Sequence, residues 1–208
     1  MENHPDRKSP GGISRRGFIK GMGTGALGAA VIPRLFGQDA IKTKAGDVPL
    51  YEKKSVKLTV NGNAATLIVA PNETLLEVLR DRLDITGPKK VCDHGQCGGC
   101  TVLLDDTPIY SCMTLAIRAD GRSITTVEGL AKGDNLHPLQ EAFIEHDGYQ
   151  CGYCAPGFLV ASAAFLAKTP NPKPEEIKLA LSGNLCRCGN YTKIYDAVAA
   201  AAGKMKGA

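Results

Sequence analysis

Hydrophobic and polar side chains alternate along residues 55–69, on either side of the dipeptide Asn61-Gly62. A period of two is typical of strands that bury one face, and Asn-Gly favours a tight turn between antiparallel strands. This pattern therefore predicts a β-hairpin. Shorter apolar runs farther along the chain predict three more strands, at residues 101–104, 109–112 and 124–127.

Residues 71–85 instead carry leucine and valine at the three- and four-residue spacing of an amphipathic helix. Farther along, helical periodicity interrupted by Gly and Pro dominates the pattern. It predicts four helices, at residues 137–146, 155–168, 173–183 and 191–203. We therefore expect an α+β chain, in which a mixed domain at residues 54–128 is followed by an all-α, four-helix domain at residues 129–208.

The N-terminal residues 1–40 have a different character. The pair Arg15-Arg16 precedes a charge-free run rich in Gly and Ala. A positive segment before a short apolar run is the layout of an export signal, and the paired arginines resemble the twin-arginine pattern. We expect this segment to direct export of the folded protein to the periplasm, with a linker at residues 41–53; the alternative is a basic tail on a cytoplasmic protein. The apolar run is too short for a transmembrane helix, so we expect no stable membrane span.

The net charge of the chain is concentrated in this N-terminal segment. The whole chain has a formal charge of +4, and residues 1–36 alone contain six basic and two acidic residues. The remainder is therefore neutral, which argues against a large basic surface for nucleic acid. We expect no nucleic-acid partner.

All eight cysteines lie beyond residue 90 and form two groups of four. The first group is Cys92, Cys97, Cys100 and Cys112, and the second is Cys151, Cys154, Cys186 and Cys188. Glycines accompany them in CDHGQCGGC and QCGYC, where they let the backbone curl round a ligand and direct amide N–H groups toward it. Thiolates bound to iron use such donors, which tune the reduction potential.

Three kinds of four-cysteine site are compatible with the first group. Zinc sites usually pair two short Cys-x2–4-Cys knuckles, whereas this group has the x4, x2 and distant fourth spacing of plant-type [2Fe–2S] proteins. Exported chains also use cysteines in disulfides, but scaffolds that depend on disulfides are typically short and poor in core. This chain has 208 residues, of which 43% are hydrophobic. The pattern favours an iron–sulfur cluster over zinc or disulfides.

The second group combines two predicted helix starts. Cys151 and Cys154 are three residues apart near one helix start, and therefore face the same way. Cys186 and Cys188 lie just ahead of the last helix and are too close together for an unstrained disulfide. Two helix N-termini at this place would put partial positive charge beside an anionic cluster. We expect these four thiols to hold a second cluster.

The hairpin, helix, cysteine loop and later strands follow the order of a β-grasp, plant-type ferredoxin domain. With the helical domain behind it, and with CDHGQCGGCTVLLDD and SGNLCRCGNY in the chain, the sequence resembles the iron–sulfur subunit of the molybdenum hydroxylases. This is the xanthine dehydrogenase and aldehyde oxidoreductase family. The resemblance covers residues 54–200. Within the family, the export signal and CDHGQCG look most like the small subunit of periplasmic aldehyde oxidoreductases.

The resemblance implies two [2Fe–2S] clusters with different positions. The cluster nearest a molybdenum cofactor would be ligated by Cys151, Cys154, Cys186 and Cys188, and the outer cluster by Cys92, Cys97, Cys100 and Cys112. Gln150 and Cys151 would contact the pterin of the molybdenum cofactor at the boundary with a large partner subunit. That partner would oxidise an aldehyde to a carboxylic acid, and the electrons would pass through the clusters to an FAD subunit or a c-type cytochrome. The chain would have no catalytic centre of its own.

Other functions fit parts of the same pattern. The chain could serve an enzyme that hydroxylates N-heterocycles, act as a free-standing exported two-cluster carrier, or be an exported binding module stabilised by zinc or disulfides. His94 lies inside the first cysteine loop, but because four cysteines fill that site we expect it to form a loop hydrogen bond. His137 and His146 flank a predicted helix and are expected to be surface or capping residues. Arg187 would offset cluster charge or form a salt bridge with the partner.

Overall fold

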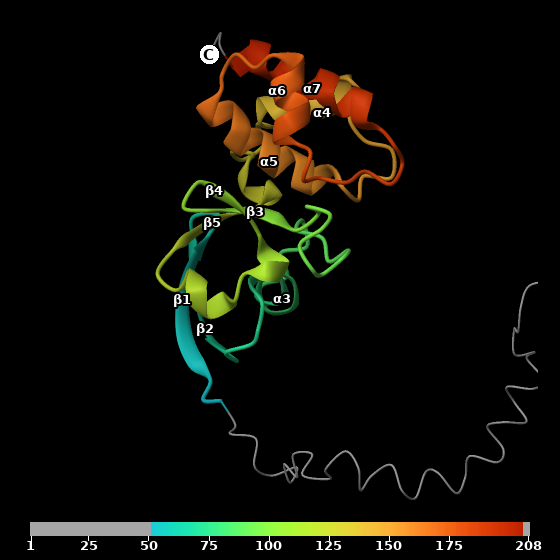
Figure 1. Ribbon diagram of the computed structural model, residues 1–208. Helices are drawn as coiled ribbons and strands as arrows, with labels where there is room; N and C mark the ends of the chain where they lie inside the picture. The colour runs from blue at the N-terminus through green and yellow to red at the C-terminus, as the bar shows by residue number, and fades with distance from the viewer. Residues whose placement is uncertain (1–50, 206–208) are drawn as a thin grey trace, which may run out of the picture. The chain divides into compact units, whose positions relative to one another are not determined.

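The computed structural model describes residues 51–205 of the 208-residue chain. The predicted export signal at residues 1–40 and most of the predicted linker lie outside these residues. The described part is a five-stranded sheet with helical turns packed on it, followed by four α-helices (Figure 1). No helix in residues 51–205 combines the length and apolar character that a membrane span requires.

The sheet is mixed, with the strand order β2-β1-β5-β3-β4. Its strands are β1 (Lys54–Val60), β2 (Asn63–Val69), β3 (Thr101–Leu104), β4 (Thr107–Tyr110) and β5 (Ser123–Thr125). The predicted hairpin is confirmed: β1 and β2 are antiparallel, and the turn residues Asn61 and Gly62 both have positive φ, at 50° and 82°. Two positive φ values in a two-residue loop match the twist of the flanking strands. β5 runs parallel to β1 and antiparallel to β3, which completes the sheet.

The predicted helix after the hairpin is present but shorter than residues 71–85. It consists of α3 (Leu75–Glu77) and a π-helical turn at Val78–Arg82. Thr74 is the N-cap: its hydroxyl accepts from the Glu77 amide at 3.2 Å, while the Glu77 carboxylate accepts from the Thr74 amide at 2.9 Å. This reciprocal capping box starts the helix. Leucine and valine side chains of the helix are fully buried, as the spacing predicts. Leu75, Val78 and Leu79 lie in the core under the sheet, and Leu76 packs against Cys100 and Cys112.

Two of the predicted strand ends are wrong. Cys112 lies in a 3₁₀ turn at Ser111–Met113, not in a strand, because β4 ends at Tyr110. The Ser111 hydroxyl and amide both donate to the carbonyl of Cys100, which turns the chain at this point. Val127 likewise begins a 3₁₀ turn, since β5 ends at Thr125.

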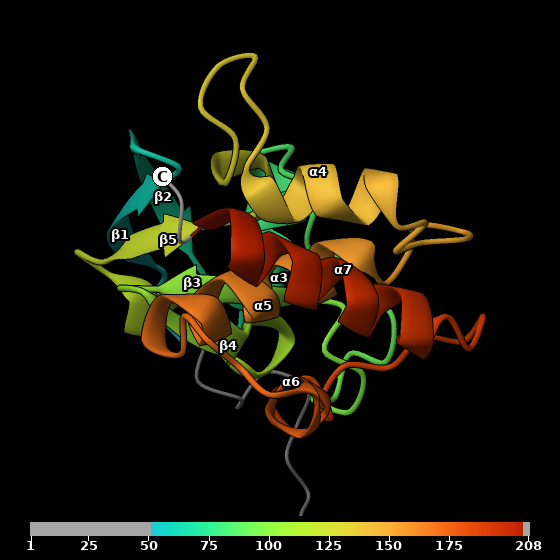
Figure 2. The same ribbon diagram turned by 90° about the horizontal axis from the view of Figure 1, so that it is seen from above.

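The four predicted helices are all present. They are α4 (Pro138–Glu145), α5 (Ala155–Lys168), α6 (Pro174–Ala180) and α7 (Tyr191–Met205). Seen from above, α7 runs between α4 and α6 (Figure 2). Their shared core is aliphatic and aromatic, and includes Phe143, Phe158 and Ile194. α5 is the helix that faces the sheet (Figure 1), where its Val160 and Ala164 pack on Leu103 of β3.

His137 caps α4, as the sequence predicts for a residue beside this helix. Its Nδ1 accepts from the Leu139 amide at 3.1 Å, and the Gln140 side chain accepts from the His137 amide at 2.9 Å. Burial, with a smaller effect of Lys132, lowers the pKa of His137 below its ordinary 6.5. Only the neutral ring can accept this bond, so the folded state favours the neutral form.

We therefore predict that the stability due to His137 is fully present above pH 6.5 and is lost as the pH falls through the lower pKa of the folded state. His137→Asn keeps a capping acceptor, worth about 1 kcal/mol, without titrating. The thermal unfolding midpoint of this variant should fall less on acidification than that of the parent. His146→Asn, at the other end of α4, is the matched control for replacing a histidine beside this helix.

Candidate iron–sulfur sites

Residues 91–100 form an irregular loop between the π-helical turn and β3. Asp93, Gly95 and Gly98 have positive φ, at 59°, 75° and 69°, so the backbone turns repeatedly within a few residues. The Gln96 amide is thereby directed at Cys92 and donates to its Sγ at 3.3 Å. A loop that turns amide N–H groups inward provides a concave site for an anionic group.

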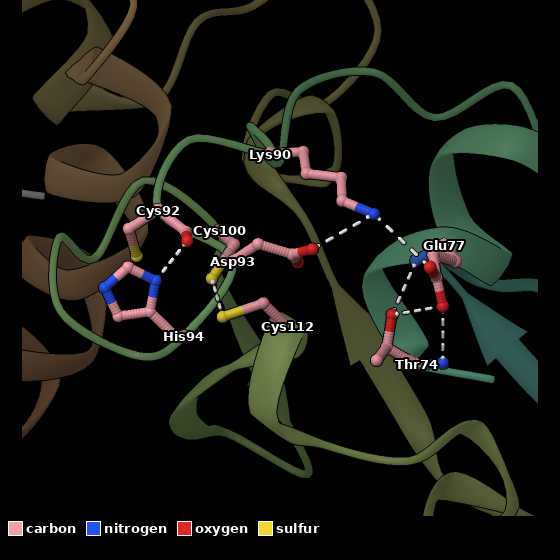
Figure 3. A network of polar contacts seen from close by, with 8 residues as sticks. All are labelled: Thr74, Glu77, Lys90, Cys92, Asp93, His94, Cys100 and Cys112. Atoms are coloured by element: carbon pink, nitrogen blue, oxygen red, sulfur yellow. Dashed lines mark hydrogen bonds and ion pairs between the residues drawn. The ribbon is translucent and has the colours of Figure 1, made fainter. Parts of the chain in front are cut away.

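The first four cysteines are brought together as two pairs. Cys100, just before β3, and Cys112 in the 3₁₀ turn have their Sγ atoms 3.3 Å apart (Figure 3). The Cys97 thiol is within hydrogen-bonding reach of Cys92 on the other side of the loop. The bonds from Ser111 to the Cys100 carbonyl hold Cys112 in place. No pattern in the sequence indicates this role of Ser111.

The surroundings of the first site shift the pKa values of two of its thiols in opposite directions. Burial disfavours the Cys92 thiolate, but hydrogen bonds from the amides of His94 and Gln96 and from Cys97 together outweigh it and lower the pKa of Cys92 from 9.0 to about 6. Burial, with the neighbouring Cys100 thiol, raises the pKa of Cys112 to about 11. Metal ligands bind as thiolates, so loading this site must release protons from buried thiols such as Cys112.

The second four cysteines are also arranged in two pairs. Cys154 is the N-cap of α5 and lies within hydrogen-bonding reach of Cys186, while Cys151 lies within the same reach of Cys188. Burial and then the Cys186 thiol raise the pKa of Cys154 to about 12. The hydroxyl of Tyr191, in the first turn of α7, accepts from the Cys186 amide at 2.9 Å.

The paired arrangement distinguishes between the kinds of metal site. All eight cysteines are free thiols. Two pairs of thiols per site instead fit a binuclear cluster, in which each of two irons takes two thiolates. The donor set and the inward amides therefore fit a [2Fe–2S] group at each site.

The other residues that the sequence analysis singled out, His94, Gln150 and Arg187, lie beside the cysteines. His94 contacts the Cys92 carbonyl through Nδ1, which is the expected loop hydrogen bond (Figure 3). Gln150 is exposed beside Cys151, and its Nε2 donates to Asn190 Oδ1 at 3.4 Å. Arg187 is exposed between Cys186 and Cys188.

Comparison with known proteins finds two domain families in the chain. Residues 58–123 match the 2Fe-2S iron-sulfur cluster binding domain, and residues 126–199 match the [2Fe-2S] binding domain. Each match contains one of the two four-cysteine sites.

Similar proteins fall in one class of oxidoreductase. The aldehyde oxidoreductase iron-sulfur-binding subunit PaoA of Escherichia coli K12 is 41% identical over 213 residues, covering 93% of this chain and 90% of its own. The structure of quinoline 2-oxidoreductase from Pseudomonas putida 86 has a chain that is 41% identical, with a TM-score of 0.72, covering 74% of this chain and 97% of that one. The aldehyde oxidoreductase from Desulfovibrio desulfuricans ATCC 27774 is 42% identical with a TM-score of 0.71, covering 74% of this chain but only 17% of that longer one.

These matches agree with the resemblance seen in the sequence and with the two paired-thiol sites. They cover the β-grasp domain and the helical domain together. At 41% sequence identity they indicate a common family and not merely a common fold. This chain belongs to the iron–sulfur subunits of the molybdenum hydroxylases, the family of aldehyde oxidoreductase and xanthine dehydrogenase.

Proposed function

We propose that this chain passes electrons from the molybdenum cofactor of a larger partner subunit, through two [2Fe–2S] clusters, to an external acceptor. The observation that carries the proposal is the presence of two four-thiol sites, each divided into two pairs, within one polypeptide. One site would suffice for a simple ferredoxin. Two sites in series are suited to carrying electrons across a subunit, from one protein surface to another.

The ligands are assigned from this arrangement. One cluster would be held by Cys92, Cys97, Cys100 and Cys112, and the other by Cys151, Cys154, Cys186 and Cys188. When bound, each cluster takes up and gives back one electron at a time. The chain holds the thiolates in place, and the Gln96 amide donates to sulfur at the first site, which favours the reduced, more negative state.

Exposure supports electron entry at the second site. Cys151 and Cys188 are exposed, and so are the aromatic side chains of Tyr149 and Tyr153 beside them, at 44% and 50%. Exposed apolar side chains around a redox site are typical of a surface that a partner covers. We infer that the large subunit binds here, with Gln150 and Cys151 against the pterin. The first site would then serve an FAD subunit or a c-type cytochrome.

We propose an aldehyde as the substrate of the complex and a carboxylic acid as its product. The support is the similarity to PaoA over nearly the whole of both chains. The similarity to the quinoline 2-oxidoreductase chain supports the alternative, hydroxylation of an N-heterocycle, because the two similarities are equal in identity. Turnover of benzaldehyde and of quinoline by the natively purified complex distinguishes the two.

Metal analysis of the natively purified complex tests the proposed function directly. We expect about four iron atoms per chain, two for each [2Fe–2S] cluster, together with molybdenum from the partner. Visible absorbance should bleach on addition of dithionite. Zinc in place of iron, or a monomer that carries iron without any partner, would contradict the proposal.

Substitution of single ligands tests the assignment of the thiols. Cys186→Ser should remove one of two reduced-cluster EPR signals, and Cys97→Ser should remove the other, because each site loses a thiolate that its iron requires. Both variants should also lose electron flow from substrate to acceptor. If either variant kept both signals at parental intensity, the ligand set would be wrong.

We further propose export to the periplasm by the twin-arginine route, which carries folded proteins and would allow the clusters to be inserted beforehand. The pattern depends on the arginines themselves, because guanidinium and ammonium groups make different contacts. Arg15→Lys with Arg16→Lys should therefore retain the protein in the cytoplasm, as measured by cell fractionation. Arg34→Lys is the matched control and should be exported normally; export of the double variant would refute the route.

A further inference from the structure

The loops that carry the two cysteine groups are in direct contact. The carbonyl of Cys97 accepts a hydrogen bond from the Leu185 amide at 2.9 Å. Leu185 is the residue immediately before Cys186. One hydrogen bond therefore links the backbone of a first-site cysteine to the neighbour of a second-site cysteine.

Asn184 holds this contact in place from one side. Its side chain is only 7% exposed, and its Nδ2 donates to the carbonyl of Gly98 at 3.1 Å. Gly98, which follows Cys97, has φ of 69°, and a Cβ there would lie 2.5 Å from Asn184 Nδ2. The absence of a side chain at Gly98 thus leaves the space that the Asn184 amide fills.

The Gly98 carbonyl is fixed on its other sides as well. It also accepts from the Thr101 hydroxyl at 2.6 Å and from the Thr101 amide at 3.2 Å. A Cβ added to Gly157, in the first turn of α5, would collide with this carbonyl oxygen. Gly98 is therefore enclosed between Asn184 and Gly157, which stand close in sequence to the second-site ligands Cys186 and Cys154.

We propose that Asn184 is a positioning residue for electron transfer between the two sites. By binding Gly98 it fixes the hydrogen bond from Leu185 to Cys97, and with it the separation of the two clusters. The rate of electron tunnelling falls steeply with separation and is lower across a gap than along bonds, so a small displacement of one loop slows the transfer. The inference rests on the proposed function of the chain as a two-cluster carrier.

The chain offers a matched control in Asn190. This residue is buried to the same extent, at 7% exposed, and its Nδ2 donates to the carbonyl of Asp147 at 2.8 Å. Its side chain forms hydrogen bonds with Asp147 and Gln150, which belong to the helical domain and not to the first cysteine loop. Replacing Asn190 removes a comparable buried amide without touching Gly98.

The test compares Asn184→Ala, Asn184→Asp and Asn190→Ala in the complete complex. Asn184→Asp keeps the shape but offers a carboxylate oxygen, which cannot donate, to the Gly98 carbonyl. Rapid-freeze EPR after mixing with substrate gives the rate at which reduction passes from the second site to the first. EPR of the fully reduced complex gives the spin–spin interaction between the clusters, which depends on their separation.

With iron content at the parental level, both Asn184 variants should show a several-fold slower transfer and a weaker spin–spin interaction, while Asn190→Ala keeps both. Parental values in the Asn184 variants would overturn the positioning role. If these variants fail to load iron, Gly157→Ala tests the same contact, because its new methyl group presses on the Gly98 carbonyl from α5. Parental transfer and spin–spin interaction in Gly157→Ala would equally overturn the inference.

The parent complex separates this inference from the proposed function. If substrate reduces neither cluster in the parent, the proposed function fails, and the positioning role fails with it. If substrate reduces both clusters in the parent and the Asn184 variants behave identically, only the positioning role fails.

Discussion

The contact between the two cysteine loops is the constraint on which the rest of the described structure depends. The bonds from Leu185 to Cys97 and from Asn184 to Gly98 join the helical domain to the β-grasp domain at the point where their candidate ligand residues lie. Tyr110 adds a third bond, from its hydroxyl to the Gly183 carbonyl at 3.1 Å. Because these are polar contacts with fixed geometry, they set the relative positions of the loops more strictly than apolar packing alone would.

Apolar packing between β3 and α5 also holds the two domains together. Leu103 of β3 packs on Val160 and Ala164 of α5, so the helix that begins next to Cys154 is also the helix that lies on the sheet. Each domain has its own core as well, one under the sheet and one among the helices. The cysteine sites thus lie on loops whose ends are anchored in two packed bodies, which keeps irregular loops in a defined geometry.

The two sites achieve the same pairing of thiols by different means. The first uses a loop with repeated positive φ and a 3₁₀ turn that returns Cys112 to Cys100. The second uses the start of α5 and the turn before α7. At both sites burial raises the pKa of one thiol, Cys112 at the first and Cys154 at the second. That thiol therefore stays protonated until a cation binds. Because metal ligands bind as thiolates, binding of a metal at these sites would require release of these protons.

The sequence by itself determined the local structure and the kind of chemistry. The alternation around Asn61-Gly62 predicted the hairpin, the three- and four-residue spacing predicted the helices, and the cysteine spacings indicated two iron–sulfur sites. These features depend on residues close to one another in the chain, where backbone preferences and side-chain periodicity are decisive. The departure of Cys112 from its expected strand was not visible, because it follows from bonds between Ser111 and Cys100.

Only the tertiary structure decided which thiols pair and what joins the sites. Asn184 and Gly98 are 86 residues apart, and no periodicity or local motif connects positions at that distance. The packing of α5 on β3 accompanies their contact, and Gly157 of α5 closely approaches the same Gly98 carbonyl. The sequence thus specifies the candidate ligands, and the packing of the two domains specifies their arrangement in space, since contacts between distant residues depend on the whole fold.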